Sequence, residues 1–136
     1  MEQPICKDPI FLSRASEPAC PEDAAIGQDL RDTLLAHRAD CVGLAANMIG
    51  QAKAIIVVDD GGKPLVMYNP EILKAAGPYE AQEGCLSLPG TRKTTRYNSI
   101  KVKYQNEDFQ TQIRTFRDFT AQIIQHECDH LKGKLI

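Results

Sequence analysis

The sequence lacks a strong excess of charge of either sign. Its 136 residues include 16 lysines and arginines against 18 acidic residues, which gives a formal net charge of −2 at pH 7. Non-specific binding to nucleic acid requires a broad positive field opposite the phosphates. We therefore expect no nucleic-acid partner.

Long apolar runs are also missing. The N-terminal stretch MEQPICKDPIFLSR is interrupted by prolines and charged residues. It contains neither the apolar core of a signal peptide nor the run of about 20 residues that spans a bilayer. We expect a cytoplasmic protein with no membrane partner.

The cysteines lack the even number and regular spacing of a disulfide framework. Such a set is typical of thiols that stay reduced in a cytosol, where a cysteine with a special role is a ligand or a nucleophile. We expect three of them, Cys6, Cys20 and Cys41, to be small buried hydrophobes. The other two, Cys85 and Cys128, lie in or near candidate motifs.

Internal repeats, low-complexity tracts and linkers are absent too. A chain of this length buries about two-thirds of its unfolded surface around one core. We therefore expect residues 1–136 to form a single domain. None of these features predicts the oligomeric state.

Apolar periodicity predicts helices toward both ends of the chain. The first twenty residues are rich in proline and should be extended, and a helix should then run from Pro21 to about Ala39. A second helical pattern begins at Asp118, and Gly133 is suited to stop it.

Short β-branched segments between the helices predict strands. Residues 54–60 and 64–70 flank the glycine pair 61–62 and should form a hairpin, and residues 71–75 should add another strand. Two more strands are expected on either side of a polar turn at 106–108. We predict an α+β fold in which antiparallel strands pack around the C-terminal helix, with an N-terminal helix beside them.

The segment QHECDHLKG, residues 125–133, places an H-E-x-x-H motif on the predicted C-terminal helix. Residues four apart lie on one helix face, so His126 and His130 can aim at one metal while Glu127 reaches a water molecule beside it. The alternative is a pair of core histidines satisfied by hydrogen bonds. Burying imidazoles without partners costs about 1–3 kcal/mol each, which favours the metal.

A catalytic metal site commonly has three protein ligands, so a third ligand must lie upstream. The candidates are His37, the carboxylates and the cysteines. Cys85 stands out in EGCLSLPG, residues 83–90, because Gly84 permits a close backbone approach and a proline stiffens the segment after it. Cys128 is a poorer candidate, since it lies about 200° around the helix from His126.

Three blocks of this sequence resemble the peptide deformylases. They are EGCLS, QHECDHLKG and CVGLAANMIG (residues 41–50), the last of which is similar to the family's first motif, G-φ-G-φ-A-A-x-Q-I-G. The resemblance extends from about Pro4 to Ile136. It implies a metal-dependent hydrolase that removes the formyl group from N-formylmethionyl peptides or nascent chains.

The resemblance also implies roles for individual residues. Cys85, His126 and His130 would be the metal ligands and Glu127 the general acid and base, with the backbone N–H of Leu86 stabilising the oxyanion. The metal would be a divalent ion, natively Fe²⁺, with Zn²⁺, Ni²⁺ or Co²⁺ as other occupants.

Further residues match the family's substrate positions. Val42, Gly43, Leu86, Phe119 and Ile123 would form the methionine pocket. Apolar members of this set are equally suited to ordinary core packing. Arg92 matches a basic position that in the family holds the peptide backbone. Without the resemblance, Arg92 is more typical of a charge in a solvated loop.

The sequence departs from the family pattern in the first motif. Met48 occupies the place of a glutamine that stabilises the oxyanion, and a thioether cannot donate a hydrogen bond. Loss of one such donor lowers turnover by about 10²–10³. We expect the side chain of Asn47 to point elsewhere, and Gln51 would need a shifted register to substitute.

Three functions are therefore compatible with the sequence. The first is a deformylase with reduced activity. The second is a deformylase-like protein that binds metal without useful turnover. The third is a metal hydrolase of another small amide or ester.

Overall fold

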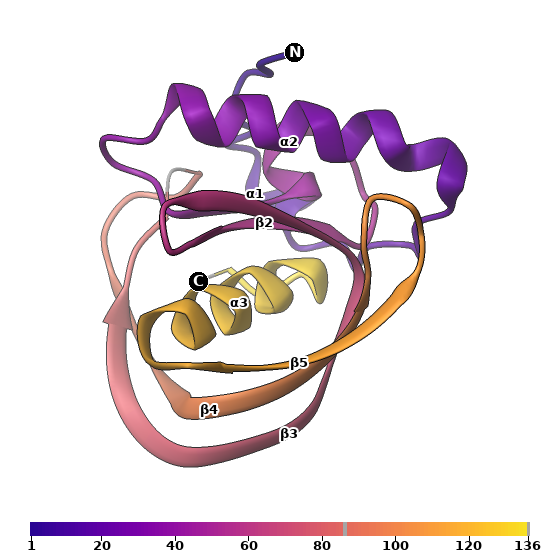
Figure 1. The fold of residues 1–136 in the computed structure, drawn as a ribbon. Helices are drawn as coiled ribbons and strands as arrows, with labels where there is room; N and C mark the ends of the chain where they lie inside the picture. Colours follow the sequence, from indigo (N-terminus) through magenta and orange to yellow (C-terminus); the bar gives the residue numbers. More distant parts are fainter. Residues whose placement is uncertain (86, 136) are drawn as a thin grey trace.

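The computed structural model describes residues 1–85 and 87–135. Their strands form one five-stranded antiparallel sheet in the order β1-β2-β3-β4-β5, which curls around helix α3 (Figure 1). The predicted α+β architecture is confirmed. The elements are α1 (Pro9–Leu12), η1 (Pro21–Asp23), α2 (Ala24–Ala36), β1 (Gly43–Ala45), η2 (Ala46–Ile49), β2 (Ile55–Asp60), β3 (Lys63–Glu83), β4 (Arg92–Gln105), β5 (Thr111–Arg117) and α3 (Asp118–Leu131).

The N-terminal part differs in detail from the sequence prediction. A short helix, α1, interrupts the expected extended segment, because Pro9 opens it and the side chain of Asp8 accepts the N–H of Ile10 at 3.0 Å. The predicted helix from Pro21 begins as the 3₁₀ turn η1. The helix ends at Ala36 and not at Ala39. Just after its last residue, the N–H of His37 donates to the carbonyls of Thr33 and Leu34.

The prediction that Cys20 is buried is wrong. Cys20 is exposed, because it precedes η1 at the surface and its thiol donates to Asp23 at 3.4 Å. Cys41 is buried as expected, and Cys6 is half-buried against the core.

The hairpin of β2 and β3 is confirmed, with Gly61 and Gly62 at positive φ in its turn. Residues 71–75 were predicted as a separate strand, but they continue β3. Register shifts near Asn69, which has φ 53°, bend this long strand so that it passes around α3 (Figure 1). The turn at 106–108 joins β4 to β5 as predicted.

Helix α3 lies inside the curled sheet, with α2 on the outer side of β2 (Figure 1). Its last nine residues, 123–131, are all buried, including five polar ones. Gly133 follows the helix with φ 80° and ends it as predicted. Because buried polar groups need partners, the fold concentrates the polar chemistry of the chain along this helix.

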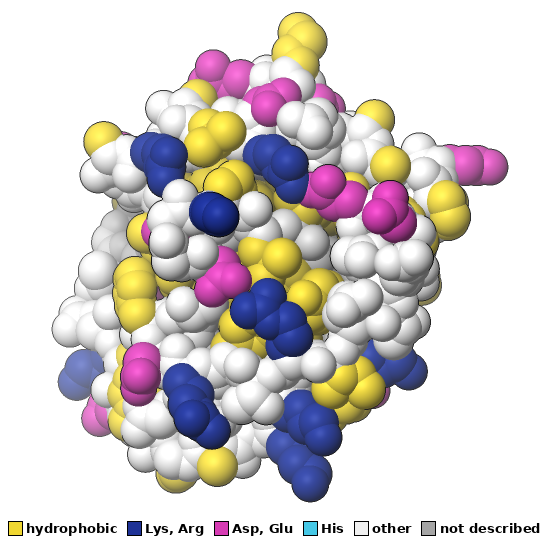
Figure 2. Space-filling view, in the orientation of Figure 1, with side chains coloured by type: hydrophobic (Ala, Val, Ile, Leu, Met, Phe, Trp, Pro, Cys, Tyr) yellow, Lys and Arg dark blue, Asp and Glu magenta, His cyan; other side chains and the backbone are white. Residues whose placement is uncertain are grey.

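Every helix in residues 1–85 and 87–135 is too short or too polar to cross a lipid bilayer. On the molecular face drawn in Figure 2, basic and acidic side chains are interspersed among exposed apolar ones.

Candidate metal centre

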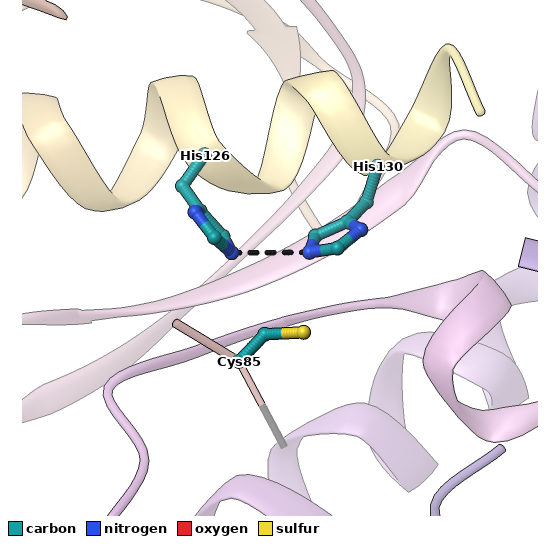
Figure 3. Close-up of side chains that lie close together, drawn as sticks. All are labelled: Cys85, His126 and His130. Atoms are coloured by element: carbon teal, nitrogen blue, oxygen red, sulfur yellow. Dashed lines mark hydrogen bonds between the residues drawn. The ribbon is translucent and has the colours of Figure 1, made fainter. Parts of the chain in front are cut away.

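Three side chains with metal-binding atoms converge at the middle of α3. The ligand atoms of Cys85, His126 and His130 all lie within 4.8 Å of one another. The two imidazoles project from successive turns of the helix and face each other, and Cys85 lies opposite them on the segment after β3 (Figure 3). Their Nε2 atoms are 3.0 Å apart. The arrangement therefore gives a geometric basis to the expectation that these three residues could bind one metal ion.

The chemistry of this donor set suits a divalent metal. Two imidazoles and one thiol are the ligands that zinc and divalent iron, cobalt or nickel accept in proteins. Both histidines are buried, and Nδ1 of His130 has no hydrogen-bond partner in the described part of the chain. The residues present therefore fit a metal ion that binds through the two Nε2 atoms and the sulfur.

A buried ion-pair network orients His126. Its Nδ1 is 2.7 Å from Oε1 of Glu83, and Arg96 binds both oxygens of that carboxylate at 2.7–3.1 Å. Arg96 also donates to Asp129 at 2.6 Å, and Gln122 donates to Glu83 at 2.9 Å. Metal-binding imidazoles commonly hold their second nitrogen in this way.

Sequence reasoning missed Glu83 and Arg96. Glu83 is the first residue of the quoted segment EGCLSLPG, and its place two residues before the candidate ligand Cys85 was the available signal. Arg96 is 3% exposed in the middle of β4. Nothing local distinguishes it from its exposed basic neighbours, because its partners come from β3 and α3.

The network fixes the charges around the histidines. Burial alone would raise the pKa of Glu83, but hydrogen bonds from His126, Arg96 and Gln122 lower it to about 2. Burial would lower the pKa of His126, but contacts with Cys85 and Glu83 raise it. Burial and the nearby His126 lower the pKa of His130 to about 4. Without metal, the surroundings therefore favour the charged form of His126 and the neutral form of His130.

Glu127 follows His126 on α3 and lines the same cavity as Cys85 and His126. Its side chain is 4% exposed, Oε1 has no partner among residues 1–85 and 87–135, and burial raises its pKa to about 7. Gly43 on β1 makes room for it, since a Cβ there would lie 2.6 Å from Ile123 Cγ2 and 3.0 Å from Glu127 Oε2. A carboxyl group with this pKa can both accept and release a proton near neutral pH.

A cavity of about 850 Å³ opens onto this site. Its walls come from the segment before β1, the loop between β3 and β4, and the first turns of α3. Among the residues with expected roles, those that line it are Val42, Gly43, Cys85, Phe119, Ile123, His126 and Glu127.

Arg92 and Cys128 lie elsewhere than the cavity wall. Arg92 opens β4, where its guanidinium is 3.5 Å from the carbonyl of Pro89, and it is not among the residues that line the cavity. Leu86 falls outside the described residues. Cys128 is buried on α3, and burial raises its pKa to about 12, which suits an inert core thiol.

The first motif forms β1 and the 3₁₀ turn η2. Met48 is 1% exposed, and its sulfur accepts the N–H of Ala45 at 3.4 Å. As expected, Asn47 points elsewhere than the cavity, because its Nδ2 donates to the carbonyl of His130 at 2.9 Å. Gln51 is exposed beyond the turn.

Burial raises the pKa of the Cys41 thiol at the cavity wall to about 11.

Comparison with known proteins finds extensive similarity. The polypeptide deformylase family model matches residues 4–136. A peptide deformylase of Clostridium beijerinckii is 51% identical over 136 residues, which is 100% of both chains. Peptide deformylase 3 of Shewanella oneidensis is 39% identical over 91% of this chain and 79% of its own length.

Solved structures agree with the sequence comparison. The crystal structure of peptide deformylase from Thermotoga maritima has a TM-score of 0.88 and 32% identity, covering 99% of this chain and 95% of that chain. An actinonin-bound class I type b peptide deformylase from Acinetobacter baumannii has a TM-score of 0.88 and 30% identity, with the same coverage of 99% and 95%. The similarity therefore extends over nearly the whole chain in both sequence and fold.

Proposed function

The chain belongs to the peptide deformylase family, and on this premise we propose that Cys85, His126 and His130 bind its metal while Glu127 transfers protons. The protein is a metal-dependent hydrolase that removes the formyl group from N-formylmethionyl peptides. The observation that carries the residue assignment is convergence: three ligand atoms within 4.8 Å lie beside a cavity that Glu127 also lines.

Hydrolysis adds water to the formyl carbon and breaks the bond from that carbon to nitrogen, which yields formate and a free N-terminus. When bound, the metal would polarise the formyl carbonyl and acidify the attacking water. Glu127 takes a proton from that water and delivers it to the leaving amine. Its pKa of about 7 allows both steps at neutral pH.

The native ion is proposed from the family, because the donor set accepts several divalent metals. We assign Fe²⁺ as the native ion, and the two nitrogens and one sulfur also suit Zn²⁺, Ni²⁺ or Co²⁺. His126 is held for binding by Glu83, which Arg96 fixes in turn. The ring nitrogen that faces the metal position is thereby oriented before the ion arrives.

The cavity is suited to the substrate's first residue. Val42, Phe119 and Ile123 supply apolar surface for a methionine side chain, and Gly43 leaves space between β1 and α3. We assign the peptide backbone to Arg92 and the oxyanion to the N–H of Leu86. The partner is thus the N-terminus of a formylated peptide or nascent chain in the cytoplasm, without nucleic acid or membrane.

Turnover should be reduced relative to a protein with glutamine at position 48. The sulfur of Met48 accepts a hydrogen bond from Ala45, so this side chain offers no donor to an oxyanion. The same observation favours the second candidate function, a metal-binding protein without useful turnover. The two differ only in rate, which makes them separable by a single assay.

The test is the release of formate from a formyl-Met-Ala peptide by protein loaded anaerobically with Fe²⁺ or Ni²⁺. We expect measurable turnover with one metal per chain. Cys85→Ser should lose the metal, whereas Glu127→Gln should keep it and lose about 10²–10⁴ in turnover. Metal retained by Cys85→Ser, or full activity in Glu127→Gln, would contradict the residue assignment. Metal binding without cleavage by the unaltered protein would leave the binding function instead.

A further inference from the structure

The two histidines of the metal centre differ in how their second ring nitrogen is held. Nδ1 of His126 is 2.7 Å from the carboxylate of Glu83. Nδ1 of His130 is fully buried, and no described residue forms a hydrogen bond with it. An imidazole that binds a metal through Nε2 carries its proton on Nδ1, and that N–H needs an acceptor when it is buried.

A matching acceptor belongs to Asn47, on the turn η2 that packs against the end of α3. Asn47 is 1% exposed, and its Nδ2 donates to the backbone carbonyl of His130 at 2.9 Å. Its Oδ1 is buried and has no hydrogen-bond partner in the part of the chain described. A buried donor and a buried acceptor, each without a partner, thus belong to two residues that are already joined by a hydrogen bond.

We propose that Asn47 is a positioning residue for His130, in which Oδ1 accepts the Nδ1–H of the imidazole through one bridging water molecule. The carboxamide is planar, so fixing its nitrogen on the His130 carbonyl restricts where its oxygen can lie. Asn47 then does for His130 what Glu83 does for His126. This inference rests on the proposed function, because metal binding at Nε2 is what fixes the proton on Nδ1.

The proposal gives the first motif a role other than oxyanion stabilisation. Asn47 and Met48 are neighbours on η2, but neither is among the residues that line the cavity. Asn47 contacts the metal centre through its hydrogen bond to the His130 carbonyl near the end of α3. It acts through His130 and does not touch the substrate.

The experiment compares Zn²⁺-loaded protein with Asn47→Leu and Asn47→Asp. Leucine has the same branched shape and number of heavy atoms but offers no acceptor, whereas aspartate keeps the acceptor and loses the donor to the His130 carbonyl. Thr33→Val is the matched control, since Thr33 is also fully buried and its hydroxyl donates to the carbonyl of Asp29, away from the metal centre. Zinc affinity is measured against a competing chelator. The protonation of the His130 ring nitrogens is observed by long-range ¹H–¹⁵N NMR.

In the unaltered protein we expect a slowly exchanging Nδ1–H on His130. Asn47→Leu should lose this signal and weaken zinc binding by about 10-fold or more. Asn47→Asp keeps an acceptor but loses the donation that places it, so it should weaken zinc binding less than Asn47→Leu does. Thr33→Val should lower stability while leaving the Nδ1–H signal and zinc affinity unchanged. An unchanged Nδ1–H and affinity in Asn47→Leu would overturn the proposal. If the unaltered protein shows no zinc-dependent shift of either histidine, the proposed function itself fails, which is a distinct result.

Discussion

Arg96 and Glu83 form a two-pronged ion pair inside the protein, with both side chains less than 10% exposed and nitrogen–oxygen distances of 2.7–3.1 Å. The pair joins β4 to the end of β3, just before Cys85. Because Glu83 also binds Nδ1 of His126, the same contact links sheet closure to the orientation of a proposed metal ligand. We therefore expect stability and metal binding to be coupled at this point.

Replacing Arg96 tests how much this pair contributes to stability. Arg96→Leu leaves Glu83 and Asp129 buried without their cation, so we expect a loss of about 3–5 kcal/mol in the free energy of unfolding. Urea unfolding of the metal-free protein measures it. Arg92→Leu is the control, because this less buried arginine has no ion pair within the described residues, and it should change stability by about 0.5 kcal/mol or less. Equal stability of the two variants would contradict the importance of the pair.

A second prediction concerns the close approach of β1 to α3. Gly43→Ala places a methyl group 2.6 Å from Ile123 Cγ2 and 3.0 Å from Glu127 Oε2. The variant should lose about 1–3 kcal/mol of stability and should also lose turnover, since Glu127 must move. Formate release per mole of bound metal separates the second effect from the first.

Gly50→Ala is the matched control for this change. Gly50 has φ 83°, and a Cβ there would meet no atom within 4 Å. Alanine should therefore cost stability through the backbone alone and leave turnover per bound metal unchanged. Loss of turnover in Gly50→Ala equal to that in Gly43→Ala would show that the contact with Glu127 is not the cause.

The cysteines should differ widely in reactivity toward a thiol reagent. Cys20 is exposed, whereas Cys41 and Cys128 are buried and burial raises their pKa to about 11 and about 12. Since the thiolate is the reactive form, brief alkylation of the native protein should modify Cys20 first and leave Cys41 and Cys128 until unfolding. Peptide mass spectrometry measures the order. Labelling of Cys128 as fast as Cys20 would contradict the burial of α3.

The parts of this fold that the sequence predicts are those whose cause is local. Gly61 and Gly62 mark a turn whatever surrounds them, and the spacing of His126 and His130 places them on one face of any helix. The continuous strand β3 could not be predicted, because the bulge near Asn69 depends on pairing with β4. A sequence pattern records neither that pairing nor the curvature that follows from it.

The candidate site divides in the same way. Its proposed metal ligands lie in short recognisable motifs, so resemblance to a family indicates them together. The residues that hold those ligands are single positions on separate elements. Arg96 becomes notable only once β3, β4 and α3 are assembled, and Asn47 only once η2 meets the end of α3. Their roles depend on contacts between distant segments, which one sequence does not reveal.

The last prediction concerns position 48, where this chain departs from the family motif. Met48→Gln introduces a carboxamide N–H on a side chain of similar length, and a donor to the developing oxyanion is worth about 10²–10³ in turnover. We expect turnover of the Fe²⁺- or Ni²⁺-loaded variant on a formyl-Met-Ala peptide to rise by about 10². Met48→Leu removes the sulfur that accepts the Ala45 N–H but adds no donor, so it serves as the control and should leave turnover within a few-fold.

Rates for all three proteins must be taken per bound metal, because a buried amide without partners costs about 1–3 kcal/mol and could lower the folded fraction of Met48→Gln. A rise confined to the glutamine variant means that the native enzyme works with one oxyanion donor fewer. Equal turnover in Met48→Gln and Met48→Leu would show that position 48 belongs to the core beneath the site. The remaining donors would then have to account for the whole of the native rate.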